Sequence, residues 1–210
     1  MRPNSEGVPV QPLMMQLVQA LHALTALEVI AVLSGLTYVV LILRRQRWGW
    51  VAGAVSSSIY VLLAARARLP MQSMLQGYYV IMAAYGWFSW KRNEEQQGGR
   101  IFRWPLRRHV YAITLIGVVS LLSARFLVRE TGAAWPLLDS LSTWTSVLAT
   151  WLVARSVLEN WLYWISADII MVFLFARQGY PFTAGLFLSY MVVSCIGLRA
   201  WSQRYRRQSG

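Results

Sequence analysis

Apolar residues run along this chain in seven long stretches separated by short polar or basic segments. The stretches are 16 to 20 residues long, close to the roughly 17 to 25 residues that a helix needs to cross the hydrocarbon core of a bilayer. A helix is required there because lipid offers no hydrogen-bond partner to free backbone groups. The pattern therefore predicts an all-α integral membrane protein with seven transmembrane helices. The predicted spans are residues 27–43, 49–65, 71–90, 109–128, 140–156, 161–176 and 182–201.

Two parts of the chain, 28–90 and 139–201, carry the same pattern when one is shifted by 111 positions without a gap. The identities include Trp, Pro, Gly and Tyr, whose placement depends on local geometry more than on hydrophobicity. We interpret the two parts as copies from an internal duplication. The matching pairs are Trp50 with Trp161, Arg66 with Arg177, Pro70 with Pro181, Leu75 with Leu186, Tyr79 with Tyr190, Gly86 with Gly197 and Trp90 with Trp201.

The single span between the copies determines their relative orientation. A copy of three helices would be followed by an inverted copy, and one additional helix restores the original direction. The sequence therefore predicts a 3+1+3 plan in which parallel repeats pack about an axis along the membrane normal. The predicted units are an N-terminal extension, a first repeat, a basic loop, a connecting helix, a second repeat and a basic tail. They span 1–26, 27–90, 91–108, 109–128, 139–201 and 202–210.

The N-terminal extension contains leucines at helical spacing. The pattern predicts either a helix lying at the membrane interface or an early extension of the first span. The leucines are Leu13, Leu17, Leu21 and Leu24.

Basic residues are distributed unevenly between the two predicted sides of the membrane. One side receives fourteen of the twenty Lys and Arg residues, and the excess of positive charge predicts that this side is cytoplasmic. The N-terminus is therefore expected outside and the C-terminus inside. The fourteen residues are Arg44, Arg45, Arg47, Lys91, Arg92, Arg100, Arg103, Arg107, Arg108, Arg155, Arg199, Arg204, Arg206 and Arg207.

The composition narrows the function classes. A net charge of +12 would suggest a nucleic-acid partner in a soluble chain, but here the basic residues lie between apolar stretches and at the C-terminus, so we expect none. The single cysteine, Cys195, has no internal disulfide partner. His22 and His109 fit no metal-site or hydrolase template, and there is no phosphate-binding loop. We therefore expect no enzymatic activity, no metal and no cofactor.

Asp168 is the acidic residue that lies well inside a predicted span. Such a group is costly in lipid, so a functional role is the first hypothesis. Asn160, Trp164 and Asp168 follow at helical spacing with Trp161 beside them, which places indoles, an amide and a carboxylate on one helix face. That face suits a flat cationic ligand. The alternative is that Asp168 only hydrogen-bonds hydroxyl groups across a helix interface.

A second polar stripe follows the third predicted span, where Gln72, Gln76 and Tyr79 share one face. These side chains offer amide and phenol groups to a ligand, or they hydrogen-bond neighbouring helices. Several of the eleven tryptophans lie near span ends, where an aromatic belt at the membrane interface is expected. These are Trp48, Trp90, Trp104, Trp135 and Trp201.

The same residues carry a family resemblance. The motifs are Leu75-Gln76 followed by Tyr79, Tyr85-Gly86-Trp87 with Trp90, and Glu159-Asn160-Trp161 followed by Trp164 and Asp168. From about residue 27 to 202 the chain resembles the PnuC family of bacterial nicotinamide riboside transporters. The resemblance implies a fold like that of the SWEET sugar transporters, a homotrimer in the inner membrane, and facilitated diffusion of riboside that a cytoplasmic kinase then phosphorylates for NAD biosynthesis. It also implies that the pocket is lined by Gln76, Tyr79, Asn160, Trp161 and Trp164.

Three alternatives stay open. Relatives of PnuC are thought to carry thiamine, riboflavin or deoxynucleosides, and thiamine is also a flat cation, so another vitamin or nucleoside is the main one. Ion-coupled transport would use Asp168 as a proton or sodium site. A membrane scaffold without transport would use Asp168 and the Gln stripe to hold helices together.

Overall fold

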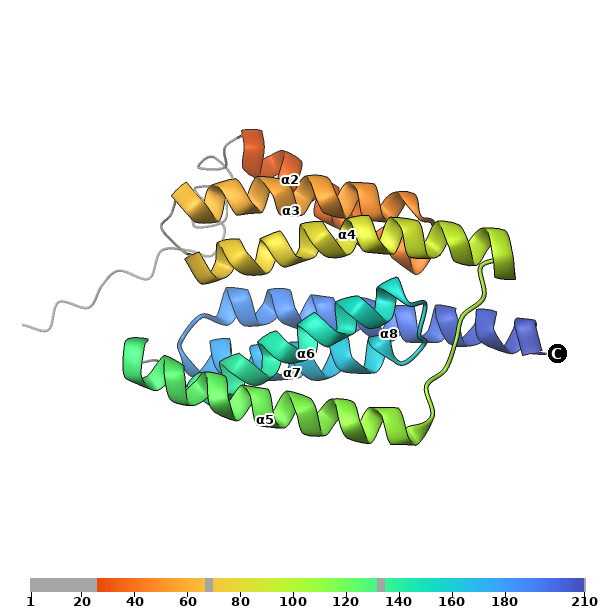
Figure 1. The fold of residues 1–210 in the computed structure, drawn as a ribbon. Helices are drawn as coiled ribbons and strands as arrows, with labels where there is room; N and C mark the ends of the chain where they lie inside the picture. Colours follow the sequence, from red (N-terminus) through yellow and green to blue (C-terminus); the bar gives the residue numbers. More distant parts are fainter. Residues whose placement is uncertain (1–25, 67–69, 132–134, 210) are drawn as a thin grey trace, which may run out of the picture.

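The computed structural model describes residues 26–66, 70–131 and 135–209. These residues form seven helices and no strand, which confirms the all-helical class (Figure 1). The predicted N-terminal extension, with its leucine pattern, lies outside the described residues except for Ala26. The helices are α2 (Ala26–Leu43), α3 (Trp48–Arg66), α4 (Pro70–Gln97), α5 (Leu106–Thr131), α6 (Pro136–Ala154), α7 (Asn160–Arg177) and α8 (Pro181–Ser209).

Among the described helices, four are long and apolar enough to cross a membrane by length and composition: α2, α3, α5 and α8. The other three, α4, α6 and α7, do not meet this criterion. α7 carries Asn160 and Asp168, and both are buried. A helix that faces protein can carry polar groups that would be costly against lipid.

Two helices continue beyond their predicted ends. α4 runs to Gln97 and α8 to Ser209, so the predicted loop 91–108 is reduced to 98–105 and the predicted tail is mostly helical. Hydropathy marks where the bilayer ends, whereas a helix continues into water while its residues favour it. Lys91 and Glu95 also form an ion pair of 3.9 Å one turn apart, which supports the extension of α4.

The helices lie in two layers (Figure 1). In one layer α3 contacts both α2 and α4, and in the other α7 contacts both α6 and α8. The layers meet where α4 contacts α6 and where α8 contacts α2, so six helices close in a ring. α5 lies outside this ring against α6. The interface between the layers is therefore formed by helices of both copies.

The two layers are related by the shift of 111 positions. Shifting the bounds of α3 gives 159–177, and α7 spans Asn160–Arg177; shifting α4 gives 181–208, and α8 spans Pro181–Ser209. The contact of α4 with α6 and that of α8 with α2 exchange under the same shift. Reciprocal contacts of this kind are what two-fold symmetry produces.

Each layer is held by a tryptophan packed on a glycine. A Cβ atom added at Gly86 would come within 3 Å of the Trp50 indole, and one at Gly197 would do the same against Trp161. Each of these indoles also contacts a second tryptophan edge to face, with ring centres 5.4 Å apart for Trp50 and 5.6 Å for Trp161. The small residue allows close helix approach, so the same device stabilises both layers.

Those second tryptophans, Trp90 and Trp201, correct a prediction. They are 0% and 1% exposed, whereas the interface belt would place them outward. Trp48 is 62% exposed and fits the belt. Position near a span end does not determine which helix face a residue occupies, and here α4 and α8 turn these two residues toward the opposite layer.

Candidate functional site

Helix α7 holds the predicted polar and aromatic face inside the bundle. Asn160 is fully buried, and its Nδ2 donates to the Val157 carbonyl at 2.6 Å. Its Oδ1 has no hydrogen-bond partner among the described residues. A buried amide oxygen without a partner is unfavourable unless another group satisfies it. Asn160 is therefore a candidate acceptor for a ligand.

The two tryptophans of this face differ in their surroundings. Trp161 is 5% exposed, and the described residues provide no acceptor for its Nε1. Its equivalent Trp50 shows the same unsatisfied Nε1. Trp164 is half-buried and packs against two clusters of buried hydrophobic residues, one around Trp90 and Trp201 and the other around Leu152 and Tyr163. Trp161 is thus part of the scaffold as well as a candidate site residue, while Trp164 is only partly buried.

Asp168 lies two turns beyond Asn160 along α7 and is 4% exposed. The Ser194 hydroxyl on α8 donates to its Oδ2 at 3.4 Å, a long hydrogen bond. This contact agrees with the interhelical alternative for Asp168, but one weak bond leaves much of the capacity of the carboxylate unused. The equivalents of Asp168 and Ser194 in the first copy are Ser57 and Ala83, so this pair of a carboxylate and a hydroxyl exists in one layer only.

The second predicted stripe lies in the other layer, on α4. Gln72 is exposed, and Gln76 and Tyr79 are half-buried. The backbones of α4 and α7 do not approach each other closely in the described part of the chain, so the predicted residues form one group in each layer, although both helices contribute side chains to one buried hydrophobic cluster. A neighbouring phenol, that of Tyr78, donates to the Val147 carbonyl on α6 at 2.8 Å and ties the layers together. A ligand touching both groups would have to bridge the layers.

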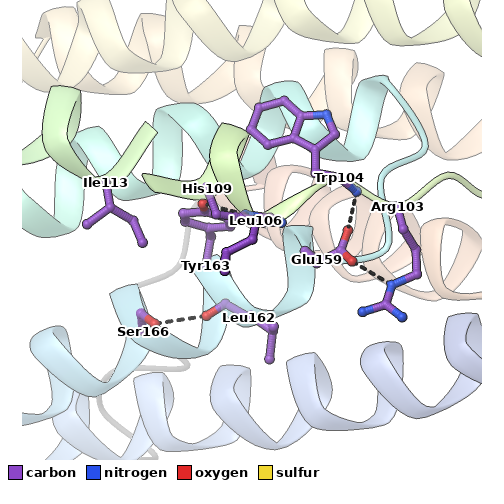
Figure 2. A pocket seen from close by; sticks show the side chains of 9 residues that line it. All are labelled: Arg103, Trp104, Leu106, His109, Ile113, Glu159, Leu162, Tyr163 and Ser166. Carbon is purple, nitrogen blue, oxygen red and sulfur yellow. Dashed lines mark hydrogen bonds and ion pairs between the residues drawn. The ribbon is translucent and has the colours of Figure 1, made fainter. Parts of the chain in front are cut away.

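A pocket of about 450 Å³ opens elsewhere, beside α5 and α7, and contains none of the seven predicted residues. In Figure 2, Glu159 is held between Arg103 and the chain at Trp104. The Arg103 Nε lies 2.8 Å from Glu159 Oε1, and the Trp104 N–H donates to Oε2 at 3.2 Å. The lining residues are Arg103, Trp104, Leu106, His109, Ile113, Glu159, Leu162, Tyr163 and Ser166.

The charged groups of this pocket serve the fold. The hydrogen bond and the charge of Glu159 raise the pKa of Arg103 in this ion pair. It ties loop 98–105 to the start of α7. His109 and Tyr163 join α5 to α7 in the same way, with 2.9 Å between Nδ1 and the phenol oxygen. We assign the pocket to the outer side of the bundle, away from the interface of the two layers.

Comparisons with known proteins agree with a transporter fold. A family model described as nicotinamide mononucleotide transporter matches residues 25–203. The riboflavin/roseoflavin transporter RibM of Streptomyces davaonensis is 26% identical over 181 residues, which cover 83% of this chain and 84% of that protein. The nicotinamide riboside transporter PnuC of Escherichia coli K12 is 23% identical over 205 residues and covers 84% of each chain.

A solved structure has the same fold. The crystal structure of the vitamin B3 transporter PnuC superimposes with a TM-score of 0.70 at 20% sequence identity. The match covers 92% of this chain and 88% of that chain.

Proposed function

The chain belongs to the PnuC family of membrane transporters, and on this premise we propose that it mediates facilitated diffusion of nicotinamide riboside into the cell. Membership of this family confirms the prediction that the chain is a vitamin transporter and not an enzyme. It also confirms a multi-pass protein of the inner membrane. The substrate, the mode of transport and the roles of individual residues are our proposals.

One observation carries the substrate proposal: α7 buries aromatic, amide and carboxylate groups whose polar atoms are not fully used within the protein. Asn160 Oδ1 and Trp161 Nε1 are without partners among the described residues. Nicotinamide riboside has a flat cationic ring, a carboxamide and ribose hydroxyls. Indoles suit the ring, Asp168 suits its charge, and the amide suits the hydroxyls. Gln72, Gln76 and Tyr79 would contact the ligand from the other layer.

Other vitamins are the second candidate. RibM, a riboflavin/roseoflavin transporter, is about as similar to this chain as PnuC is. Riboflavin is a neutral ring system, so a buried carboxylate such as Asp168 favours a cationic ligand over it. Thiamine is a flat cation and remains the nearest competitor of the riboside.

We propose further that the chain has the SWEET-like 3+1+3 arrangement of parallel repeats and forms a homotrimer. The equivalent helix bounds under the shift of 111 positions support the parallel repeats. α5 supports an assembly surface, since its side chains Leu106, Tyr111 and Leu115 are 64–78% exposed. These residues face lipid or another copy. A cytoplasmic kinase would trap the entering riboside by phosphorylation.

The orientation is also a proposal. The loops after α2, α4 and α6 lie with the end of α8 at one end of the bundle, which we call the arginine-rich end. Its excess of basic charge supports a cytoplasmic position for this end. An active alkaline phosphatase fused to the C-terminus would contradict this orientation.

Uptake into proteoliposomes tests the mode of transport. We expect labelled nicotinamide riboside to reach equal concentrations on both sides and an uncoupler to leave the initial rate unchanged, because a uniporter needs no ion gradient. Empty liposomes serve as the control. Accumulation above the external concentration that collapses with the uncoupler would replace uniport by ion-coupled transport, with Asp168 as the first residue to test.

A further inference from the structure

At the arginine-rich end, residues that are equivalent in the two copies touch one another. Arg45 Nη2 donates to the hydroxyl of Ser156, which lies 111 positions later. The rings of Trp90 and Trp201, separated by the same shift, have centres 6.0 Å apart. A residue can contact its own equivalent only where the axis relating the two halves passes. These four residues, which we call the axial cluster, therefore mark that axis.

The tryptophans of the axial cluster join the two layers by reciprocal hydrogen bonds. Trp90 Nε1 donates to the Val153 carbonyl at 3.0 Å, and Trp201 Nε1 donates to the Ile42 carbonyl at 3.3 Å. Ile42 and Val153 are again equivalent positions. Each bond connects the C-terminal half of α4 or α8 in one layer to the end of α6 or α2 in the other, so any separation of the layers here breaks both.

Arg45 fills the space between the tryptophans. It is 6% exposed, with its guanidinium carbon 3.8 Å from the centre of the Trp90 ring and 5.3 Å from that of Trp201. Burial lowers its pKa to about 9, so it keeps its charge at neutral pH. Nε and Nη1 have no hydrogen-bond partner among the described residues. Besides the two rings and the Ser156 hydroxyl, its one further partner in the described part of the chain is the Arg100 carbonyl, which accepts a long hydrogen bond of 3.4 Å from Nη2. No carboxylate forms an ion pair with Arg45 among the described residues, so its release breaks hydrogen bonds and ring contacts but no ion pair.

Loop 98–105 crosses the same end of the bundle between α4 and α5 (Figure 1). The Arg100 carbonyl accepts from Asn93 Nδ2 at 2.8 Å, and Asn93 also donates to the Ser156 hydroxyl at 3.0 Å. Further along, the Leu158 N–H donates to the Phe102 carbonyl at 2.8 Å. The loop thus covers the axial cluster from outside.

We propose that Arg45 is the gating residue that closes the transport path at the arginine-rich end and must leave the Trp90–Trp201 pair before substrate passes. This rests on the proposed transport function. In transporters built from two like halves the path follows the interface between them. A side chain that occupies the axis blocks that path. Opening therefore requires Arg45 to withdraw and the reciprocal tryptophan bonds to part.

A single reporter cysteine tests the gate without any substrate. Ala83 is 4% exposed and lies on the face of α4 that carries Trp90, two turns further into the bundle. In a Cys195→Ser background, Ala83→Cys provides one thiol whose alkylation by a hydrophilic maleimide reports opening. We expect Arg45→Asn to raise the alkylation rate in detergent about tenfold or more, because local opening becomes more frequent. Asn tolerates the left-handed backbone of this position, where φ is 62°.

Arg44→Asn is the matched control, because it removes the same charge from the exposed neighbouring position and should leave the rate within about twofold of the parent. Ser156→Gly is the second gate variant; it removes the hydroxyl acceptor at φ 60°, a backbone that glycine adopts freely, and should also raise the rate. If Arg45→Asn does not fold, Ser156→Gly decides.

A folded gate variant whose rate stays at that of the Arg44→Asn control would overturn the proposal. A parent protein that carries no riboside would overturn the proposed substrate, and the alkylation rates would still report on the gate.

Discussion

Replacing Trp164 with Ala should weaken nicotinamide riboside binding by about 10- to 100-fold, because stacking of one base on an aromatic side chain contributes roughly 1–3 kcal/mol. Trp164 is half-buried on the polar face of α7, between Asn160 and Asp168 in the sequence, and its truncation removes ring contact without creating a fully enclosed cavity. The measurement is the dissociation constant of the purified variant, by calorimetry or by quenching of intrinsic fluorescence.

Alanine variants of two other tryptophans, Trp161 and Trp48, serve as comparisons for this measurement. Trp161 packs on Gly197 and is 5% exposed, so Trp161→Ala should lower stability by about 3–5 kcal/mol and confound binding with folding. Trp48 is 62% exposed at a helix start, and Trp48→Ala should leave the affinity unchanged. An affinity of Trp164→Ala equal to that of Trp48→Ala would remove Trp164 from the proposed site.

Alanine substitutions at two glycines of α4, one packed on a tryptophan and one in open space, should change stability in opposite directions. Gly86→Ala places a Cβ within 3 Å of the Trp50 indole, and overpacking of this kind costs about 1–3 kcal/mol. Gly77 lies on the same helix with no atom within 4 Å of an added Cβ. Gly77→Ala should therefore stabilise slightly, by about 0.5–1 kcal/mol, since Ala favours a helix over Gly.

α8 offers the same comparison in the second copy. Gly197→Ala meets the Trp161 indole within 3 Å, while Gly185 has open space around it. Melting temperatures in detergent should fall for Gly86→Ala and Gly197→Ala and rise or stay unchanged for Gly77→Ala and Gly185→Ala. Equal melting temperatures for Gly197→Ala and Gly185→Ala would show that the indoles yield and that these glycines do not define the layer packing.

The helices could be predicted because the bilayer imposes a simple rule on long apolar stretches. The predicted spans match the observed helices within a few residues at most ends, and the errors occur where a helix leaves the membrane. Lys91 and Glu95 continue α4 although both are charged, since a helix outside lipid depends on propensity and side-chain pairs rather than on hydropathy.

The buried end of the bundle could not be predicted because it depends on tertiary contacts between distant residues. Arg45 belongs to a basic segment that is typical of an exposed loop, yet it lies between Trp90 and Trp201. Nothing local distinguishes it from Arg44, which is exposed. The usable signal was the shift of 111 positions, because it pairs Arg45 with Ser156 and Trp90 with Trp201.

The site itself stays a prediction, but part of its arrangement could be predicted. Helical spacing placed Asn160, Trp164 and Asp168 on one face of α7 with Trp161 beside them; Asn160, Trp161 and Asp168 are buried, and Trp164 is half-buried. The spacing within α4 grouped Gln76 with Tyr79 but gave no information on how α4 lies relative to α7. Those helices lie in different layers, and their separation depends on packing that a single sequence does not specify.

The most direct test of the substrate is a thermal shift series on the detergent-solubilised protein with nicotinamide riboside, nicotinamide mononucleotide, thiamine, riboflavin and deoxynucleosides. A ligand that binds the folded state alone must stabilise it, by about 2.7 kcal/mol at a concentration 100 times its dissociation constant. We expect selective stabilisation by nicotinamide riboside. Stabilisation by thiamine or riboflavin without the riboside, or by none of these compounds, would contradict the proposed function.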